Sequence, residues 1–393
     1  MPNALERLLG EFPAEDFQRL VETRRDLHRH PELAFEETRT AAVAARRLRQ
    51  AGWTPREGVG KTGVTADRAS ETPRKTGRIL LRADMDALPL AEETGAVYTS
   101  KVSGKMHACG HDGHVAIAIS MAERLANHPA AAGCRFLFQP AEEGAGGAQA
   151  CASDGVLEGV TSAFGLHLWN QLPLGKIGVN RSALMAAVDE FSIDVTGPGG
   201  HGASPHETSD TILAASRIVE ALQSVVAREI SPLDSAVVTI STIHGGSSFN
   251  IIPSQVRLTG TARSFTDAVG DALPKKIERI VAGTAQAAGV QAQLHYRRLN
   301  RATVNDRAMA ELVIETAGRL LGPENVESET RTLGGEDMSV FLDRVPGCFF
   351  FVGSAPADGH RPHHSPRFDI DERALVVGLR LFEEVALEAA RRL

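Results

Sequence analysis

The sequence predicts an α/β fold: a mostly parallel sheet with helices on both faces, interrupted by a smaller inserted α+β domain. Continuous apolar strands such as Gly77–Ala83 and Cys134–Gln139 alternate with helical segments, as in parallel sheets that are covered on both faces. The middle of the chain instead follows the order β-α-β-β-α-β. With 393 residues, the chain is also longer than a single core usually supports.

In the two outer parts of the chain, helices are expected where apolar residues recur every three or four positions. Strands are expected where short apolar runs are bounded by turn residues. The segment after Asp112 is expected to form an amphipathic helix. The elements predicted in order are helices at Leu8–His28 and Glu36–Ala51, a strand at Gly77–Ala83, a helix at Asp112–Asn127, a strand at Cys134–Gln139 followed by a short helix, a strand ending at Thr161–His167, a helix at Asn305–Leu321, a strand at Gly347–Val352 and a helix at Asp371–Arg392.

The middle segment has four alternating strands and two helices, the split βαβ pattern. We therefore expect a discontinuous outer domain, residues 1–188 and 302–393, and an inserted domain, residues 189–301. The elements expected in the insertion are strands at Glu190–Thr196, Ala236–His244, Gln255–Ser264 and Gln291–Leu299, and helices at Ser209–Arg228 and Asp267–Ala288.

The composition excludes several classes of protein. The net charge is −7 and no stripe of Lys or Arg is present, so we expect no nucleic-acid partner. No run approaches the roughly 18 apolar residues of a membrane span, and we expect neither a membrane partner nor a signal peptide. Four cysteines in so long a chain cannot form a disulfide framework. These observations predict a cytoplasmic protein.

Histidine is the unusual part of the composition, because nine of the 14 histidines fall in four short neighbourhoods, at 107–114, 167, 201–206 and 360–364. The densest is MHACGHDGH, Met106–His114. Cys109 and His111, two residues apart in a loop, project to the same side and can bind one metal ion or two adjacent ones. Alternatively, Asp112 caps a helix and the histidines lie on the surface. Three His, one Cys and one Asp within nine residues favour metal binding.

Carboxylates follow two of the predicted strands. Glu142 and Glu143, in PAEEG, come just after Cys134–Gln139, and one of them can bind metal while the other acts as general base. Such a pair alone is usually a solvated charge pair. Its position favours function, because parallel sheets place their sites at these strand ends. Asp84 and Asp86 follow Gly77–Ala83 in the same way.

Further candidate ligands are His167, which closes a strand, and the neighbours His363 and His364, in a loop before the last helix. Taken singly, His167 is more often a hydrogen-bonded core histidine, and the other two are ordinary loop residues. All the candidates, however, lie on strand-end loops of one sheet. Imidazole, carboxylate and thiolate together favour zinc, with manganese, cobalt or nickel also compatible, over calcium or magnesium. Five or more ligands predict two ions.

The inserted domain has a polar cluster of its own. His201 lies in the glycine-rich turn GPGGHGASP, and NIIPSQVRLTGTAR contains Asn250 and Arg263. Each has an ordinary structural interpretation, as turn or strand-surface residues. The functional interpretation is that His201 and Asn250 stabilise an oxyanion and Arg263 pairs with a substrate carboxylate.

Eight motifs occur in an order that closely resembles the amidohydrolase branch of the aminoacylase and metallocarboxypeptidase family. That branch contains hippurate hydrolase, N-acyl-amino-acid amidohydrolases and indoleacetyl-amino-acid hydrolases. The resemblance runs from HRHPELAFEE, at His28–Glu37, to the last helix. The motifs are RADMDALP, MHACGHDGH, PAEEG, GLHLW, GPGGHGASP, NIIPSQVRLTGTAR, GGEDMS and HHSPRFD.

The resemblance implies a role for each matching residue. Glu142 is then the general base acting on a metal-bound water, and Asp86 orients the site. The implied ligands of two divalent ions are Cys109, His111, Glu143, His167 and His364, the last chosen over His363 because it directly precedes Ser-Pro. The inserted domain acts as a lid and homodimer interface and carries His201 to the partner's active site; Asn250, Arg263, His201 and Gly334 contact the substrate.

The expected reaction is metal-dependent hydrolysis of the amide bond in an N-acyl amino acid, a small-molecule substrate, releasing a carboxylic acid and an amino acid. A carboxypeptidase or dipeptidase acting on short peptides with the same site is the alternative. A different class is an enzyme in which Cys109 is the nucleophile. A binding protein with an inactive site is disfavoured, because binding needs no base such as Glu142.

Overall fold

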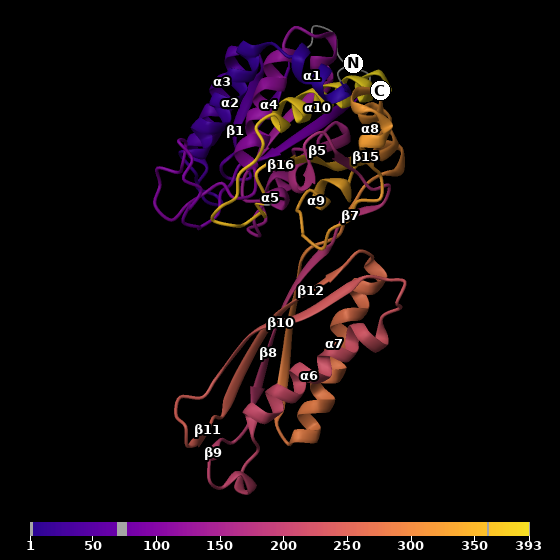
Figure 1. Cartoon of the computed structure of the whole chain (residues 1–393). Helices are drawn as coiled ribbons and strands as arrows, with labels where there is room; N and C mark the ends of the chain where they lie inside the picture. Colours follow the sequence, from indigo (N-terminus) through magenta and orange to yellow (C-terminus); the bar gives the residue numbers. More distant parts are fainter. Residues whose placement is uncertain (1–2, 69–76, 360, 393) are drawn as a thin grey trace. The chain divides into compact units, whose positions relative to one another are not determined.

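The computed structural model describes residues 3–68, 77–359 and 361–392, so that His360 lies outside the described residues. The chain forms two compact units (Figure 1). Residues 1–184, 304–331 and 337–393 make up the first unit, and residues 185–303 and 332–336 the second. The boundaries predicted after residues 188 and 301 lie close to these positions, whereas the assignment of 332–336 to the second unit was not anticipated.

The first unit is built on one eight-stranded sheet with the order β1-β2-β4-β3-β5-β16-β6-β15. Its central pairs, β4 with β3, β3 with β5 and β5 with β16, are parallel, which confirms the predicted fold class. The strands are β1 (Thr54–Val59), β2 (Gly63–Asp67), β3 (Arg78–Asp84), β4 (Cys134–Gln139), β5 (Val160–Pro173), β6 (Ile177–Gly178), β15 (Val326–Glu327) and β16 (Gly347–Ala355).

The hairpin of β1 and β2 was not predicted. It adds antiparallel strands at one edge of the sheet, with β2 pairing with β4. The sequence TPREGV of β1 is largely exposed and has neither an apolar run nor a regular alternation, so it gives no strand signal. Strand β5 continues beyond the predicted end at His167, as far as Pro173.

Helix α4 lies at the centre of the first unit, next to α10 (Figure 1). The prediction that it is amphipathic is wrong: nearly every residue from His111 to Ala122 is buried, because α2, α3, α10 and the sheet surround it. Ile79, Leu81 and Ala83 of β3 share its core. The helices of this unit are α1 (Ala4–Glu11), α2 (Ala14–His28), α3 (Thr38–Gln50), α4 (His111–Leu125), α5 (Gly147–Ser153), α8 (Arg307–Leu321), α9 (Ser339–Leu342) and α10 (Ala374–Arg392).

The predicted helix Leu8–His28 is in fact two helices, α1 and α2. Phe12 has extended backbone (φ −81°, ψ 126°), and Pro13 directly precedes the first residue of α2. Proline lacks the N–H that a helix interior needs, and it disfavours helical backbone in the residue before it. Apolar periodicity continues across the break, which is why the pattern alone suggested one helix.

The second unit is a four-stranded antiparallel sheet, β10-β12-β8-β13, with α6 and α7 side by side against it (Figure 1). Phe191, Ile193 and Val195 alternate on β8 and face the helices in a separate core. Its elements are β8 (Ala187–Thr196), β9 (Gly200–His201), α6 (Thr211–Glu229), β10 (Ala236–Gly245), β11 (Ile251–Ile252), β12 (Gln255–Ser264), α7 (Asp267–Ala288) and β13 (Gln291–Asn300). Two short strands, β7 (Ala183–Met185) and β14 (Thr303–Val304), lie where the chain passes from one unit to the other.

Candidate metal centre

The carboxyl ends of three neighbouring parallel strands position the candidate ligands. Asp84 ends β3 and pairs with Gln139, which ends β4, so the segments that follow them leave the sheet together. Asp86 and Glu142 thereby become neighbours, with a hydrogen bond of 3.0 Å from the Glu142 N–H to Asp86 Oδ1. His167 comes from β5, the strand on the other side of β3. The carboxyl ends of β3, β4 and β5 therefore bring Asp86, Glu142 and His167 to the same side of the sheet.

The six predicted ligand and base residues form overlapping groups in which the potential ligand atoms lie within 4.8 Å of one another. Cys109 belongs to two of these groups, and its Sγ lies 3.5 Å from His167 Nε2. The groups are Cys109, His111 and His167; Cys109, Glu143 and His364; and His111, Glu142 and Glu143. Because each group shares a member with another, they form one continuous cluster.

The ring nitrogens of His111 and His167 are oriented for metal binding. His111 Nδ1 is 2.8 Å from the backbone carbonyl of Asp86, and His167 Nδ1 is 2.8 Å from the carbonyl of Leu168. A carbonyl only accepts hydrogen bonds, so the proton lies on Nδ1 and the lone pair on Nε2 of each ring. His111 Nε2 is buried and has no hydrogen-bond partner among the described residues. Such a nitrogen fits a metal ion.

The other two histidines of MHACGHDGH differ from each other. His114 uses both ring nitrogens: Nδ1 is 2.6 Å from Asp84 Oδ1, and Nε2 accepts the N–H of Leu168 at 2.9 Å. His107 is buried, and neither ring nitrogen has a hydrogen-bond partner among the described residues. Burial lowers the pKa of His107 to about 4, so this ring is neutral near pH 7.

The structure also separates the adjacent histidines 363 and 364. His363 Nε2 is 3.0 Å from the Leu168 carbonyl, and its ring stacks on Trp169. His364 Nε2 instead lies 3.1 Å from Glu143 Oε1. The neighbouring Cys109 and Glu143 raise the pKa of His364 to about 10. Of the two, His364 is the one grouped with the candidate ligands Cys109 and Glu143, and its role as a metal ligand stays a prediction.

The PAEEG turn has its backbone held in an unusual conformation. Ala141 has φ +55°, a region that residues with a side chain seldom occupy. Asp86 accepts the next two backbone N–H groups, Glu142 at 3.0 Å and Glu143 at 2.9 Å. Asp86 therefore holds the backbone of both glutamates, while its predicted role in orienting the site stays a prediction.

The donor set suits divalent transition ions. One thiol, three imidazoles and carboxylates in one cluster match zinc and its neighbours rather than the all-oxygen sites of calcium. Five ligand residues also exceed the four that a single tetrahedral ion takes. The residues present therefore fit a pair of ions.

A buried ion network lies behind the cluster and was not predicted from the sequence. Arg24, on α2, is fully buried; its Nε donates to Asp112 Oδ2 at 2.9 Å, and its other nitrogens reach Asp369 and Glu372. His28 Nδ1 lies 2.8 Å from the same Asp112 oxygen. Asp112 directly follows His111, so α2 anchors the start of α4. No spacing rule could have linked Arg24 with Asp112, because they are 88 positions apart.

We expect Arg24→Ala to lower the free energy of unfolding by about 3–5 kcal/mol, the usual cost of leaving a buried charge without its partner. Denaturant unfolding measures this change. The matched control is Arg25→Ala, whose partly exposed side chain also pairs with Glu372 and whose loss should cost at most about 1 kcal/mol. Equal losses for the two variants would contradict the anchoring role of Arg24.

The predicted residues of the second unit lie in two places. His201 and Asn250 are exposed neighbours, because β9 pairs with β11 and the Gly202 N–H donates to the Asn250 carbonyl at 2.8 Å. His201 Nδ1 accepts the Ala203 N–H at 3.1 Å, and Asn250 Oδ1 accepts from Ser248 at 2.8 Å. Within the part of the chain that the structure describes, no acceptor binds the remaining side-chain N–H groups of His201 and Asn250, so both are available to a ligand.

Arg263 lies on β12 of the four-stranded sheet, whereas β9 and β11 form a separate two-stranded sheet, of which β11 comes just before the start of β12 in sequence. Arg263 is eight positions along β12 from Gln255, which corresponds to roughly 26 Å of extended strand. Arg263 forms no ion pair with any described carboxylate of its own unit, and burial lowers its pKa. Gly334 is not part of β12. It lies in the segment 332–336 of the second unit, where its carbonyl accepts the Ala186 N–H at 3.0 Å. Within one chain, therefore, Arg263 and His201 are not brought together.

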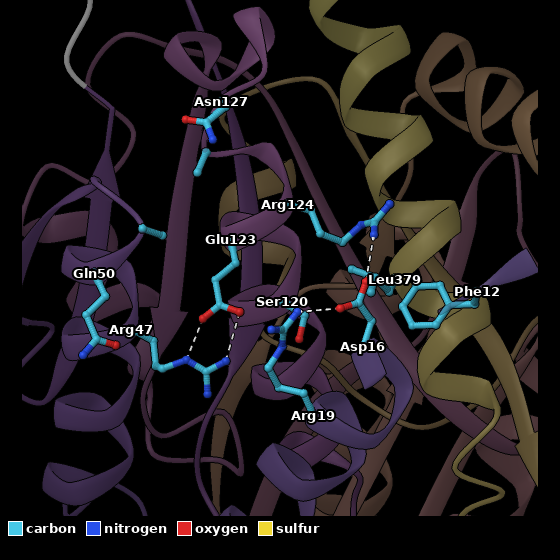
Figure 2. A pocket seen from close by; sticks show the side chains of 12 residues that line it. Phe12, Asp16, Arg19, Arg47, Gln50, Ser120, Glu123, Arg124, Asn127 and Leu379 are labelled. Carbon is cyan, nitrogen blue, oxygen red and sulfur yellow. Dashed lines mark hydrogen bonds and ion pairs between the residues drawn. The ribbon is translucent and has the colours of Figure 1, made fainter. Parts of the chain in front are cut away.

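A separate cavity of about 640 Å³ lies near the other end of α4, lined by residues of α2, α3, α4 and α10 and by Phe12, which follows α1 (Figure 2). Its charged side chains pair with one another: Arg47 contacts Glu123 at 2.6 Å, and Arg19 contacts Asp16 at 2.6 Å. None of the metal-ligating groups found among the described residues lines it. The chemistry of the first unit is thus concentrated at the strand ends.

Comparisons with known proteins agree with this geometry. The model of the peptidase family M20/M25/M40 matches residues 80–388. An N-acetylcysteine deacetylase of Bacillus subtilis is 40% identical over 379 residues, covering 94% of this chain and 96% of the relative. Thermostable carboxypeptidase 1 of Saccharolobus solfataricus is 38% identical over 367 residues, covering 91% and 92%.

Among solved structures, the YXEP protein of Bacillus subtilis, described as a dinuclear metal binding peptidase from the M20 family, superposes with a TM-score of 0.83. It is 36% identical, and the match covers 97% of this chain and 100% of that one. The matching model spans most of the chain, and the relatives are well above 30% identical over nearly their whole length. The chain therefore belongs to the peptidase family M20/M25/M40 and is a hydrolase of that family.

Proposed function

We propose that the protein hydrolyses the amide bond of N-acyl amino acids, releasing a carboxylic acid and an amino acid. The observation that carries this proposal is the arrangement of Glu142 and Glu143. Both belong to one group with His111, but Glu143 also belongs to the group of Cys109 and His364. Two adjacent carboxylates can therefore take different roles, one as ligand and one as base.

Cys109, His111, Glu143, His167 and His364 are the proposed ligands of two divalent ions, zinc in first place and manganese, cobalt or nickel as substitutes. The description of the YXEP relative as dinuclear supports two ions. Divalent ions held here acidify a water molecule and stabilise negative charge on the substrate carbonyl oxygen.

Glu142 is the proposed general base. It takes a proton from the attacking water and passes that proton to the nitrogen of the departing amino acid. Its side chain is almost fully buried, and its backbone is fixed through Asp86. A carboxylate held in this way needs little reorganisation as the reaction proceeds.

The inserted unit is the proposed lid and homodimer interface. His201 and Asn250 supply N–H donors to the carbonyl oxygen, with His201 acting in the partner subunit, while Arg263 pairs with the substrate carboxylate and Gly334 also contacts the substrate. The distance between Arg263, near the far end of β12, and His201, on β9, supports a shared site, because within one unit the two residues lie too far apart for the same small substrate. All four cysteines are buried thiols rather than disulfides, which supports the proposed cytoplasmic location. None of the helices within the described ranges is long and apolar enough to cross a membrane.

A substrate panel separates this proposal from a carboxypeptidase acting on short peptides, which the Saccharolobus relative makes the second candidate. We expect kcat/KM for N-acetyl and N-benzoyl amino acids to exceed that for dipeptides with the same carboxyl-terminal residue by at least about tenfold, equivalent to about 1.4 kcal/mol in transition-state stabilisation. Liberated amino acid is measured with a single metal-loaded preparation. A preference for the dipeptides would establish the carboxypeptidase instead.

A further inference from the structure

Glu37 is a buried carboxylate 104 positions before Ala141 of the PAEEG turn, and the reaction described above gives it no role. Its side chain is fully buried at the start of α3. Glu37 Oε1 accepts the Ala141 N–H at 2.8 Å and the Phe35 N–H at 3.0 Å. Oε2 accepts the hydroxyl of Thr62. One carboxylate thus joins three separate segments of the first unit.

These three segments share a strained backbone. In the described part of the chain, four residues other than glycine have positive φ, namely Phe35 (63°), Lys61 (85°), Ala141 (55°) and His364 (63°). Glu37 binds the N–H groups of Phe35 and Ala141 and the hydroxyl of Thr62, next to Lys61. Strained backbone of this type persists only where surrounding contacts impose it, and it gathers at functional sites.

The effect on the PAEEG turn is specific. Three successive N–H groups, those of Ala141, Glu142 and Glu143, all donate to buried carboxylates, the first to Glu37 and the next two to Asp86. Behind them, Gly147 closes the turn by donating its N–H to the Ala141 carbonyl at 3.0 Å. The directions in which Glu142 and Glu143 leave the backbone are therefore fixed by two carboxylates outside the turn.

We propose that Glu37 is a positioning residue of the hydrolytic site, which holds Ala141 in its left-handed conformation and so aims Glu142 and Glu143 at the metal cluster. This inference rests on the proposed function for what Glu142 does. The placement of the turn by Glu37 can be tested without any substrate.

The first test is Glu37→Ala. Because partners of metal ligands typically contribute 10–100-fold to affinity or activity, we expect kcat on an N-acetyl amino acid, and zinc affinity, each to fall by about 10–100-fold. KM should stay within about twofold, because substrate binding in the ground state does not depend on the turn. Zinc affinity is measured by competition with a chromophoric chelator, which is independent of turnover.

Conservative and rescue variants distinguish positioning from general stabilisation. Glu37→Gln keeps the Oε1 acceptor for both N–H groups and should retain kcat within about threefold of wild type, since a typical hydrogen bond contributes only about 1 kcal/mol. Adding Ala141→Gly to Glu37→Ala should recover at least about threefold in kcat and in zinc affinity. Alanine at positive φ carries a steric cost of roughly 1 kcal/mol, and glycine does not.

The matched control is Glu32→Ala. Glu32 lies in the same segment and also accepts two backbone N–H groups, those of Arg39 and Thr40, both at 2.8 Å, but at the start of α3 rather than in the turn. Its loss should lower the unfolding midpoint in a similar way while kcat and zinc affinity stay within about twofold of wild type. If Glu37→Ala does not fold, Glu37→Asp replaces it in the comparison with Glu32→Ala. The shorter side chain moves the carboxylate away from the Ala141 N–H by about one methylene group.

The inference is overturned if Glu37→Ala keeps wild-type kcat and zinc affinity, if Glu32→Ala loses as much, or if Ala141→Gly restores nothing. Failure of the proposed function looks different. In that case wild-type protein does not hydrolyse N-acyl amino acids, yet the zinc affinities of the Glu37, Ala141 and Glu32 variants still show whether Glu37 positions the turn.

Discussion

Glu142→Ala is expected to lower kcat for an N-acyl amino acid by about 10²–10⁴-fold, the usual contribution of a general base, while metal content stays at the wild-type value. The truncated side chain removes the proton acceptor, but the backbone N–H of residue 142 can still donate to Asp86, so the turn should survive. Steady-state kinetics, together with metal analysis of the same sample, measures both parts of the prediction.

The adjacent glutamate provides the control. Glu143→Ala should lose metal, because Glu143 lies in the group of Cys109 and His364 as well as that of His111. The two substitutions remove the same chemical group from neighbouring positions and differ only in which role they remove. The smallest usual effect of losing a general base is about 100-fold, which leaves about 1% of the activity. A higher residual activity in Glu142→Ala would therefore contradict the assignment of Glu142 as the base.

Chelation is expected to abolish activity, and zinc, manganese, cobalt or nickel should restore it. Removing the ions leaves buried metal-binding atoms of the cluster, such as His111 Nε2, without a partner among the described residues. The unfolding temperature should also fall, since a ligand present at about 1,000 times its Kd stabilises the folded state by about 4 kcal/mol. Activity and thermal unfolding are followed in parallel during dialysis against chelator and readdition of each ion.

The same chelation experiment also tests whether Cys109 is a catalytic nucleophile rather than a metal ligand. If Cys109 attacks the substrate, activity survives chelation, and alkylation inactivates the enzyme whether or not metal is bound. If Cys109 is a ligand, metal protects it from alkylation, because its sulfur is already engaged. Cys134, Cys151 and Cys348 are buried apart from the cluster and serve as reference thiols that should not respond to metal. Full activity in the chelated protein would rule out the metal mechanism.

The strand ends and the ligand motifs could be predicted from sequence because both are local patterns. Apolar runs located β3, β4 and the start of β16 within about two residues, and parallel strands place their carboxyl ends at one edge of a sheet. Cys109 and His111 lie within one motif. His167 and His364, by contrast, could be joined to them only through the fold.

The supporting contacts could not be predicted, because each depends on side chains far apart in sequence. Glu37 meets Ala141 across 104 positions, and Arg24 meets Asp112 across 88. Arg24 stands in no motif, and Glu37 ends the segment HRHPELAFEE, where the family resemblance begins, but nothing in that segment indicates a contact with the PAEEG turn. The assignment of residues 332–336 to the second unit could not be predicted either, because it also depends on contacts between residues far apart in sequence, such as Ala186 and Gly334.

The anchoring of α4 by α2 has a practical consequence for anyone designing fragments of this protein. The family model begins to match at residue 80, so a fragment trimmed to the matched range keeps every candidate ligand. It would nevertheless discard Arg24, His28 and Glu37, which hold the ligand-bearing segments in place. Such a fragment contains all the groups that bind metal but lacks the contacts that give them their arrangement. The first helices therefore have to be expressed together with the site.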